Sequence, residues 1–185
     1  MATPMTDKSP DFTETQLSSK TVYQGRLLQV LEDEVRLPDG RQARREYIRH
    51  PGACAMVPLL DERTVMLVRQ FRYPMGRHFL EIPAGKIDHG EDPLATARRE
   101  LIEECGYEAA SWSHFTTIHT CIGYSNERIE MFLARDLRHV GHAPDDGEFL
   151  EAVPVALDQA LAWIREGKIT DPKTMIGLLW ARSFL

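Results

Sequence analysis

The chain has few cysteines and no excess of positive charge. Its 185 residues include three cysteines, Cys54, Cys105 and Cys121, which show neither metal-ligand nor paired spacing. Cys54 lies in an apolar run and Cys105 on an apolar helix face, so we expect free thiols and a cytoplasmic protein. Lys and Arg number 22 and Asp and Glu 28, a net charge of −6, which argues against a nucleic-acid-binding surface.

Long apolar stretches are also missing. The longest run, around residues 53–60, is far shorter than the ~20 residues of a membrane-spanning helix. Residues 1–20 lack the apolar core of a signal peptide, and we expect them to form a flexible arm. With 43% apolar and 27% charged residues, the chain can bury one sizeable core and has room for a small extra unit.

Residues 85–107, GKIDHGEDPLATARRELIEECGY, predict a loop that runs into a helix. Asp92 can cap the first turn, Pro93 suits the first helical position, and Gly106 ends the helix. An apolar stripe at helical spacing is made by Leu94, Ala97, Leu101 and Cys105. This helix can therefore dock on a core through one face.

The same helix carries three glutamates on another face. Glu100, Glu103 and Glu104 are at i, i+3 and i+4, so their carboxylates cover about a quarter of the helix circumference. An exposed acidic face is usually only solvated, because each like-charge pair costs just about 0.2–0.5 kcal/mol. The surrounding pattern decides between that interpretation and a functional one.

That pattern reproduces the Nudix box, G-x5-E-x7-R-E-U-x-E-E-x-G-U, in which U is bulky and apolar. The matching residues are Gly85, Glu91, Arg99, Glu100, Leu101, Glu103, Glu104, Gly106 and Tyr107. The one deviation is Tyr107, where an aliphatic residue is more usual. The chain thus resembles a Nudix hydrolase. The resemblance implies an α+β fold, an α/β/α sandwich with a mixed sheet and the box helix on one side.

Three clustered carboxylates are a hard-oxygen site suited to Mg²⁺, with Mn²⁺ as a possible substitute. In the family that the chain resembles, the metal ligands correspond to Glu100, Glu104, the carbonyl of Ala84 and, variably, Glu103. Arg99 and Glu91 resemble the family's structural ion pair.

Residues 21–49 predict a small antiparallel β-unit. The sequence VYQGRLLQVLEDEVRLP alternates, turns at residues 38–40, and resumes in RQARREYIR. We therefore expect an N-terminal β-unit at 21–50 and the Nudix domain at 51–185.

This β-unit resembles the one that is exchanged across a homodimer in the ADP-ribose pyrophosphatase branch, where it helps to build the nucleoside pocket. We accordingly expect a homodimer. Arg45 and Tyr47 share a strand face, and two interpretations stay open: ordinary strand-surface residues, or contacts to nucleoside and phosphate.

Two strands, ACAMVPLL and TVMLVRQF, precede the box. The second ends in charged residues, which suggests that Arg72 and the following Glu81 face a cleft, where a guanidinium can hold a diphosphate oxygen. In similar sequences, the matching residues contact substrate or metal. The alternative is a surface ion pair between side chains.

Strands at residues 112–119 and 130–135 flank the loop TCIGYSNE, residues 120–127. The ADP-ribose branch usually has a proline where this chain has Ile122, followed by Gly-x-Ser-x-Glu, which survives as Gly123, Ser125 and Glu127. With Ile122 at this position, the chain resembles nucleoside diphosphate sugar hydrolases that act on a broader range of substrates. An ordinary tight turn at Gly123 is the other interpretation.

The resemblance implies Mg²⁺-dependent hydrolysis of ADP-ribose or a related nucleoside diphosphate sugar to a nucleoside monophosphate and a sugar phosphate. One alternative is a hydrolase of nucleoside triphosphates or dinucleotide polyphosphates. The other is a non-catalytic Nudix-like regulator, but such proteins usually lose box carboxylates and gain a basic unit.

A metal-activated water also needs a proton acceptor, and carboxylates bound to Mg²⁺ are poor bases. The branch takes this base from a mobile loop after the later strands. Here the acidic segment 145–148 fits, and Glu148 is the predicted base. Glu127 and Glu103 are the alternatives, and a merely solvated acidic loop is the other interpretation.

Overall fold

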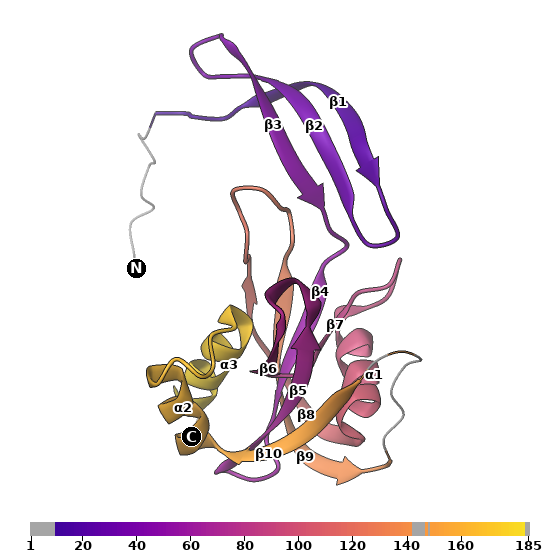
Figure 1. Cartoon of the computed structure of the whole chain (residues 1–185), viewed down its shortest axis with the longest axis vertical. Helices are drawn as coiled ribbons and strands as arrows, with labels where there is room; N and C mark the ends of the chain where they lie inside the picture. The colour runs from indigo at the N-terminus through magenta and orange to yellow at the C-terminus, as the bar shows by residue number, and fades with distance from the viewer. Residues whose placement is uncertain (1–9, 142–146, 148, 184–185) are drawn as a thin grey trace, which may run out of the picture. The chain divides into compact units, whose positions relative to one another are not determined.

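The chain divides into two compact units in a computed structural model that describes residues 10–141, 147 and 149–183. One unit comprises the residues up to His50 together with Gly123–Asn126. The other comprises Pro51–Ile122 and Glu127–Leu185. Figure 1 traces the elements in chain order.

The first unit is a three-stranded antiparallel sheet in the order β1-β2-β3. Its strands are β1 (Thr15–Gln24), β2 (Gln29–Arg36) and β3 (Gln42–Arg49). The predicted flexible arm at 1–20 therefore extends too far, because β1 begins at Thr15. Every residue of β1 is exposed, so the strand has no buried alternate positions that an apolar pattern could reveal.

The second unit contains two sheets. The order β7-β4-β9-β8 is mixed, since β4 runs parallel to β9, and the order β10-β5-β6 is antiparallel. The strands are β4 (Ala53–Pro58), β5 (Thr64–Arg72), β6 (Arg77–Glu81), β7 (Ala84–Lys86), β8 (Tyr107–Ile118), β9 (Ile129–His139) and β10 (Leu150–Ala156), with a 3-10 turn, η1 (Tyr73–Met75), between β5 and β6.

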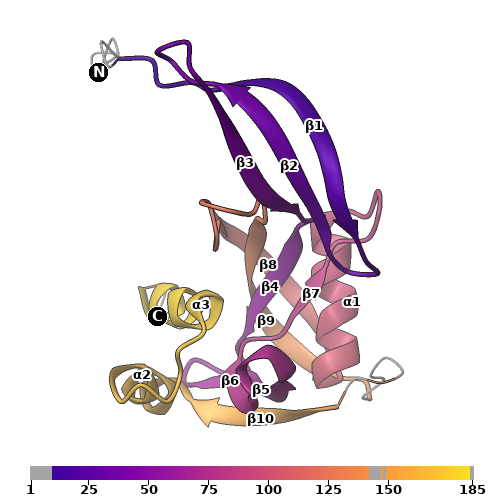
Figure 2. The same cartoon turned by 45° about the horizontal axis from the view of Figure 1, so that its top comes forward.

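Strand β4 is buried along its whole length and supplies both cores. Ala55 and Val57 face a cluster that includes residues of α2 (Leu157–Arg165) and α3 (Pro172–Ser183). Cys54 and Met56 face a second cluster with the apolar stripe of α1 (Pro93–Cys105). Figure 2 shows α1 on one side of these strands and α2 with α3 on the other. The expected helix–sheet–helix sandwich with a mixed sheet is confirmed.

Helix α3 lies close to the sheet at Gly177. A Cβ at that position would meet the side chains of Val57 at 2.9 Å and Ile82 at 3.1 Å. The absence of a side chain therefore sets how near the helix comes to β4. In the part of the chain that the structure describes, no helix combines the length and apolar character needed to cross a membrane.

Strand β8 begins earlier than the predicted residue 112, directly after the box helix. Gly106 ends α1 in the left-handed region, with φ of 76°, and its N–H donates to the carbonyls of Ile102 and Leu101. The chain reverses at this one residue, so the strand begins at Tyr107. The aromatic residue at the last box position thus opens a strand and packs on the cluster under α1.

Candidate active site

The box segment folds as the loop and helix that its sequence predicts. The Asp92 carboxylate accepts hydrogen bonds from the N–H groups of Leu94 at 3.0 Å and Ala95 at 3.2 Å, and Pro93 occupies the first helical position. This cap fixes where α1 begins, and hence which side chains of the helix face the preceding loop.

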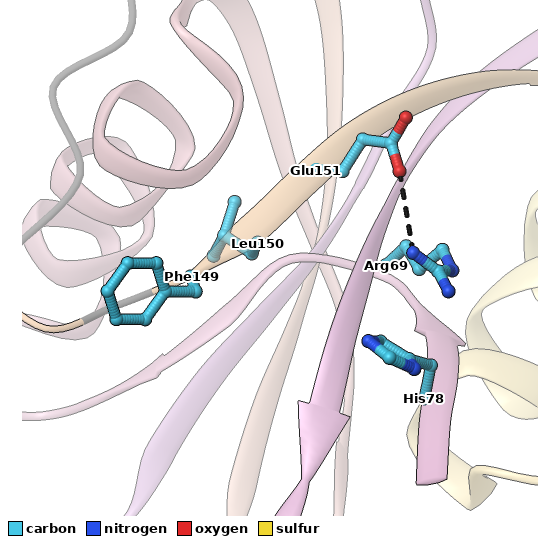
Figure 3. A pocket seen from close by; sticks show the side chains of 5 residues that line it. All are labelled: Arg69, His78, Phe149, Leu150 and Glu151. Atoms are coloured by element: carbon cyan, nitrogen blue, oxygen red, sulfur yellow. Dashed lines mark ion pairs between the residues drawn. The ribbon is translucent and has the colours of Figure 1, made fainter.

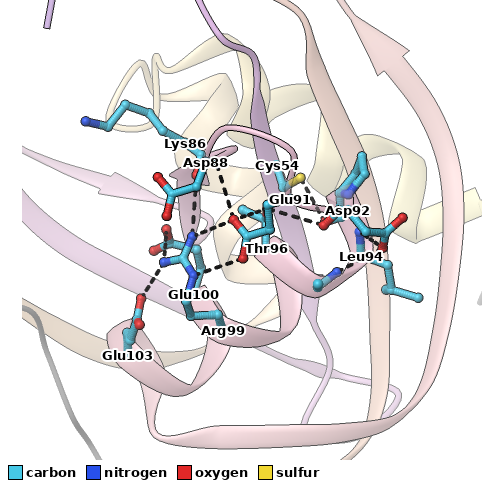
Figure 4. A network of polar contacts seen from close by, with 12 residues as sticks. Cys54, Lys86, Asp88, Glu91, Asp92, Leu94, Thr96, Arg99, Glu100 and Glu103 are labelled. Carbon is cyan, nitrogen blue, oxygen red and sulfur yellow. Dashed lines mark hydrogen bonds and ion pairs between the residues drawn. The ribbon is translucent and has the colours of Figure 1, made fainter.

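Arg99 is the centre of an ion-pair network that joins this loop to the helix (Figure 4). Its Nε and Nη2 donate to the two carboxylate oxygens of Glu91 at 3.2 and 3.1 Å. Its Nη1 donates to Glu100 at 2.9 Å and to Glu103 at 2.8 Å. One guanidinium thus contacts three carboxylates, including two of the three that the sequence assigns to metal, and the predicted pair of Arg99 with Glu91 is present.

The Glu91 side chain is held from two sides. Besides Arg99, the hydroxyl of Thr96 donates to it at 2.7 Å. These hydrogen bonds, that of Arg99 first, lower the pKa of Glu91 from 4.5 to about 2. The hydrogen bond with Glu91, followed by the negative charges of Glu100 and Glu103, raises the pKa of Arg99.

Two of the box carboxylates, Glu100 and Glu104, lie against the backbone of the Ala84–Gly85 segment. Glu104 accepts a hydrogen bond from the N–H of Ala84 at 2.9 Å. A Cβ built on Gly85 would stand 1.8 Å from the carboxyl carbon of Glu100, so the Glu100 carboxylate occupies the space that any side chain here would need. Both glutamates are largely buried, at 9% exposure for Glu100 and 4% for Glu104. Hence β7 and α1 bring Ala84, Glu100 and Glu104 together.

These residues fit a divalent hard cation by the chemistry of their donor atoms. Glu100, Glu103 and Glu104 offer carboxylate oxygens beside the Ala84 segment, and Mg²⁺ favours such ligands. In the described residues, no group of three His, Cys, Asp or Glu side chains is already arranged as a metal cage. Two of these carboxylates, those of Glu100 and Glu103, are instead paired with Arg99.

Arg72 and Glu81 form a bidentate ion pair, with Arg72 Nε and Nη2 at 2.7 and 2.8 Å from the two oxygens of Glu81. The pairing of side chains that the sequence left as an alternative is thus observed, and a substrate contact by either residue stays a prediction. The hydrogen bond with Glu81 is the main cause of a raised pKa of Arg72, and the negative charge of Glu104 adds to it. Glu81 also pairs with Lys173 of α3, which sequence reasoning missed.

Comparison with known proteins agrees with this geometry. Residues 49–175 match the family model described as the NUDIX domain. The chain belongs to the Nudix family. Residues 14–48 match the nucleoside diphosphate sugar hydrolase N-terminal domain. This span includes residues 14–20, which the sequence predicts to be part of the flexible arm.

Two curated relatives align with most of the chain. A methanol dehydrogenase activator of Bacillus methanolicus is 37% identical over 90% of this chain and 91% of its own length. An ADP-ribose pyrophosphatase of Bacillus subtilis is 36% identical over 87% of this chain and 88% of its own. A solved structure described as an ADP compounds hydrolase has a TM-score of 0.85 at 24% identity, covers 96% of this chain and 97% of its own, and shares the fold.

Four further predicted site residues of this Nudix protein lie in its first unit. Ser125 forms a parallel bridge with Ile48 of β3, and the Ile48 N–H donates to the carbonyl of Tyr124 at 2.8 Å. The loop with Gly123 and Ser125 thus lies beside the strand that carries Arg45 and Tyr47. Arg45 is paired with Glu14. The structure thus places the loop next to one end of the strand, and contact of the four residues with substrate stays a prediction.

The structure describes two of the three residues that are predicted as the general base. Glu148 lies outside the described residues. Glu127, before β9, accepts a hydrogen bond from Thr120. Glu103 pairs with Arg99 at 2.8 Å. The structure therefore assigns the base to none of the three.

An open hollow of about 270 Å³ lies on the β10-β5-β6 sheet, and none of the described residues that line it is a predicted site residue (Figure 3). It is lined by Arg69, His78, Phe149, Leu150 and Glu151. Arg69 and Glu151 are directly opposite each other in the antiparallel pair, with charged atoms 3.8 Å apart. Such an exposed pair contributes little to stability.

We predict that Glu91→Gln destabilises the protein in a pH-dependent way. Because folding lowers the pKa of Glu91, the ionised carboxylate stabilises the fold fully above pH ~4.5, and this contribution is lost as pH falls toward 2. The substitution should lower the free energy of unfolding by about 1–2 kcal/mol at pH 7, after allowance for the partial exposure of the side chain. Chemical denaturation of both proteins between pH 7 and 3 measures it. Glu62→Gln, in an exposed turn, controls for net charge, and a pH-independent difference would contradict the assignment.

Gly85→Ala should reduce activity while the fold is retained. Gly85 has ordinary backbone angles, so alanine adds no backbone strain, but its Cβ must displace the flexible Glu100 carboxylate. We expect kcat to fall by about 10²-fold, as for other displaced site groups, with a small change in melting temperature. Steady-state kinetics and thermal melting of the same samples test this, and unchanged kcat would remove Glu100 from the site.

Proposed function

We propose that this Nudix protein hydrolyses the diphosphate of ADP-ribose or a related nucleoside diphosphate sugar, and releases a nucleoside monophosphate and a sugar phosphate. The observation that carries the proposal is the gathering of Glu100 and Glu104 at the Ala84–Gly85 backbone, with Glu103 held on the same guanidinium as Glu100. The N-terminal match and the pyrophosphatase relative support the substrate class.

Mg²⁺ is the proposed cofactor, held by Glu100, Glu103, Glu104 and the Ala84 carbonyl, with Mn²⁺ as a substitute. When bound, such an ion polarises a diphosphate and lowers the pKa of an attacking water. The protein's own contribution is to fix these oxygen donors. Arg99 offsets the repulsion among them, and the Ala84 N–H orients Glu104.

Arg72 is proposed to bind a diphosphate oxygen, with Glu81 orienting it through the bidentate pair. Arg45, Tyr47, Gly123 and Ser125 are the proposed contacts to the nucleoside part. The proposed proton acceptor is Glu148, with Glu127 and Glu103 as alternatives. Of these, Glu103 is the weakest candidate, because it is also a proposed metal ligand and its carboxylate already accepts a hydrogen bond from Arg99.

A substrate panel tests the function. ADP-ribose, GDP-mannose, ADP-glucose, a diadenosine polyphosphate and a dNTP are incubated with Mg²⁺. Products are measured as phosphate after phosphatase treatment, except for the dNTP, which phosphatase attacks directly and for which released pyrophosphate is measured. We expect the highest kcat/KM for ADP-ribose or another nucleoside diphosphate sugar, and loss of turnover with a chelator. A preference for the dNTP or the diadenosine compound would overturn the proposed substrate class.

Glu104→Gln is the matched active-site variant for this panel. It removes one charge and keeps the shape of the side chain, so kcat should fall by at least ~10²-fold while the fold is retained. Wild-type turnover of this variant at saturating Mg²⁺ would contradict the proposed metal site.

We further propose that the protein is a cytoplasmic homodimer. The free thiols of Cys54, Cys105 and Cys121 support the location. For the dimer, the supporting feature is β1, an edge strand exposed throughout. Exposed apolar side chains of β1 and the turn after it are Leu17, Val22, Tyr23, Leu27 and Leu28. An exposed apolar surface of this kind is usually buried in an interface, and a second copy of the chain can bury it.

Light scattering should accordingly give the mass of two chains at micromolar concentration. The double variant Val22→Lys/Tyr23→Lys should shift the protein toward a monomer, since it adds repulsive charge to the exposed strand. Lys20→Glu, on the same strand but already charged, is the control. A monomeric parent protein would exclude the dimer and any nucleoside pocket that depends on it.

A further inference from the structure

Four charged side chains meet where β5, β6 and the start of α3 come together: Arg72, Glu81, Asp171 and Lys173. Glu81 is 3% exposed and Lys173 9% exposed. The Lys173 ammonium pairs with Glu81, which also holds Arg72, and lies 2.9 Å from the Asp171 carboxylate. The network therefore links a buried lysine of the last helix to the proposed phosphate-binding arginine.

The backbone next to Glu81 is tied to the same helix. The N–H of Ile82 donates to the hydroxyl of the buried Thr174 at 2.9 Å, and the N–H of Thr174 donates to Asp171 at 3.0 Å. Lys173 and Glu81 are thus held at a fixed spacing by neighbouring hydrogen bonds, although 92 residues separate them in the chain.

The charges of the network balance as two positive and two negative. Burial by itself raises the pKa of Glu81, and the contacts with Arg72 and Lys173 outweigh it, so the pKa lies below its usual value. Without Lys173, one positive charge would face two carboxylates, one of them fully enclosed, and an uncompensated buried charge is strongly unfavourable.

Arg72 is the end of this network that reaches solvent, with 42% of its side chain exposed. A guanidinium has five N–H groups in a fixed fork, and the pair with Glu81 uses two of them. The direction of the other three is therefore set by where Glu81 holds the fork. Glu81 in turn depends on Lys173 for its position and charge.

We propose that Lys173 is a positioning residue for diphosphate binding: it holds the buried Glu81 carboxylate, which aims the Arg72 guanidinium at a phosphate oxygen beside the box carboxylates. This inference rests on the proposed function. It assigns to the last helix a role in substrate affinity, in addition to its packing on the sheet.

The test is a double-mutant cycle in the full-length protein with ADP-ribose and Mg²⁺. Lys173→Met should raise KM by about 10-fold and change kcat by less than about 3-fold. In the Arg72→Ala background, the same change should alter KM by less than about 2-fold, because Lys173 acts through Arg72. Lys168→Met, an exposed lysine just before α3, is the matched control and should leave KM within about 2-fold of the parent.

A general loss of folding would behave differently, since it would reduce activity by the same factor in both backgrounds. That result, or an unchanged KM for Lys173→Met, would overturn the positioning role while the hydrolase activity of the parent stands.

If the single variant does not fold, Glu81→Gln/Lys173→Met carries the test, because it leaves no unpaired charge between the two positions. Its KM should match that of Arg72→Ala, and a parental KM would overturn the inference. A parent without turnover on the substrate panel would instead remove the proposed function, and this inference with it.

Discussion

The contact between Arg99 and the three carboxylates of Glu91, Glu100 and Glu103 is the interaction on which the site depends. Glutamates at i, i+3 and i+4 repel each other, and two of the box carboxylates are largely buried, where repulsion is screened least. A single guanidinium can contact several carboxylates because its donors point in fixed, divergent directions. The loop before the helix is held by the same group.

The apolar layers explain why this polar arrangement can be rigid. Strand β4 alternates its side chains between the two cores, and α1 is fixed to one of them by its apolar stripe. The adjacent face of the helix, with Glu100 and Glu104, is then directed at the Ala84–Gly85 backbone of β7, which pairs with β4. Packing of the core and placement of the carboxylates are therefore consequences of the same register.

Sequence reasoning succeeded where the determining contacts are local. The capped helix at Asp92, the pair of Arg99 with Glu91 and the clustering of Glu100 with Glu104 all follow from spacing within one segment. It was wrong where the signal is tertiary. Strand β1 has no buried face, so no apolar alternation distinguishes its residues 15–20 from the predicted arm. Lys173 contacts Glu81 across 92 positions, and nothing around either residue predicts the pair.

The close approach of α3 at Gly177 has a consequence for how this protein can diverge. The helix cannot move outward to accommodate a larger side chain without also withdrawing Lys173, one turn earlier, from the Glu81 carboxylate. A position that faces the apolar side chains of Val57, Ile82 and Met131 is therefore constrained by the ion pair of Lys173 with Glu81. Substitutions of Gly177 should therefore be limited by the need to keep this ion pair, and compensating changes should appear at Val57 and Ile82 rather than in α3 itself.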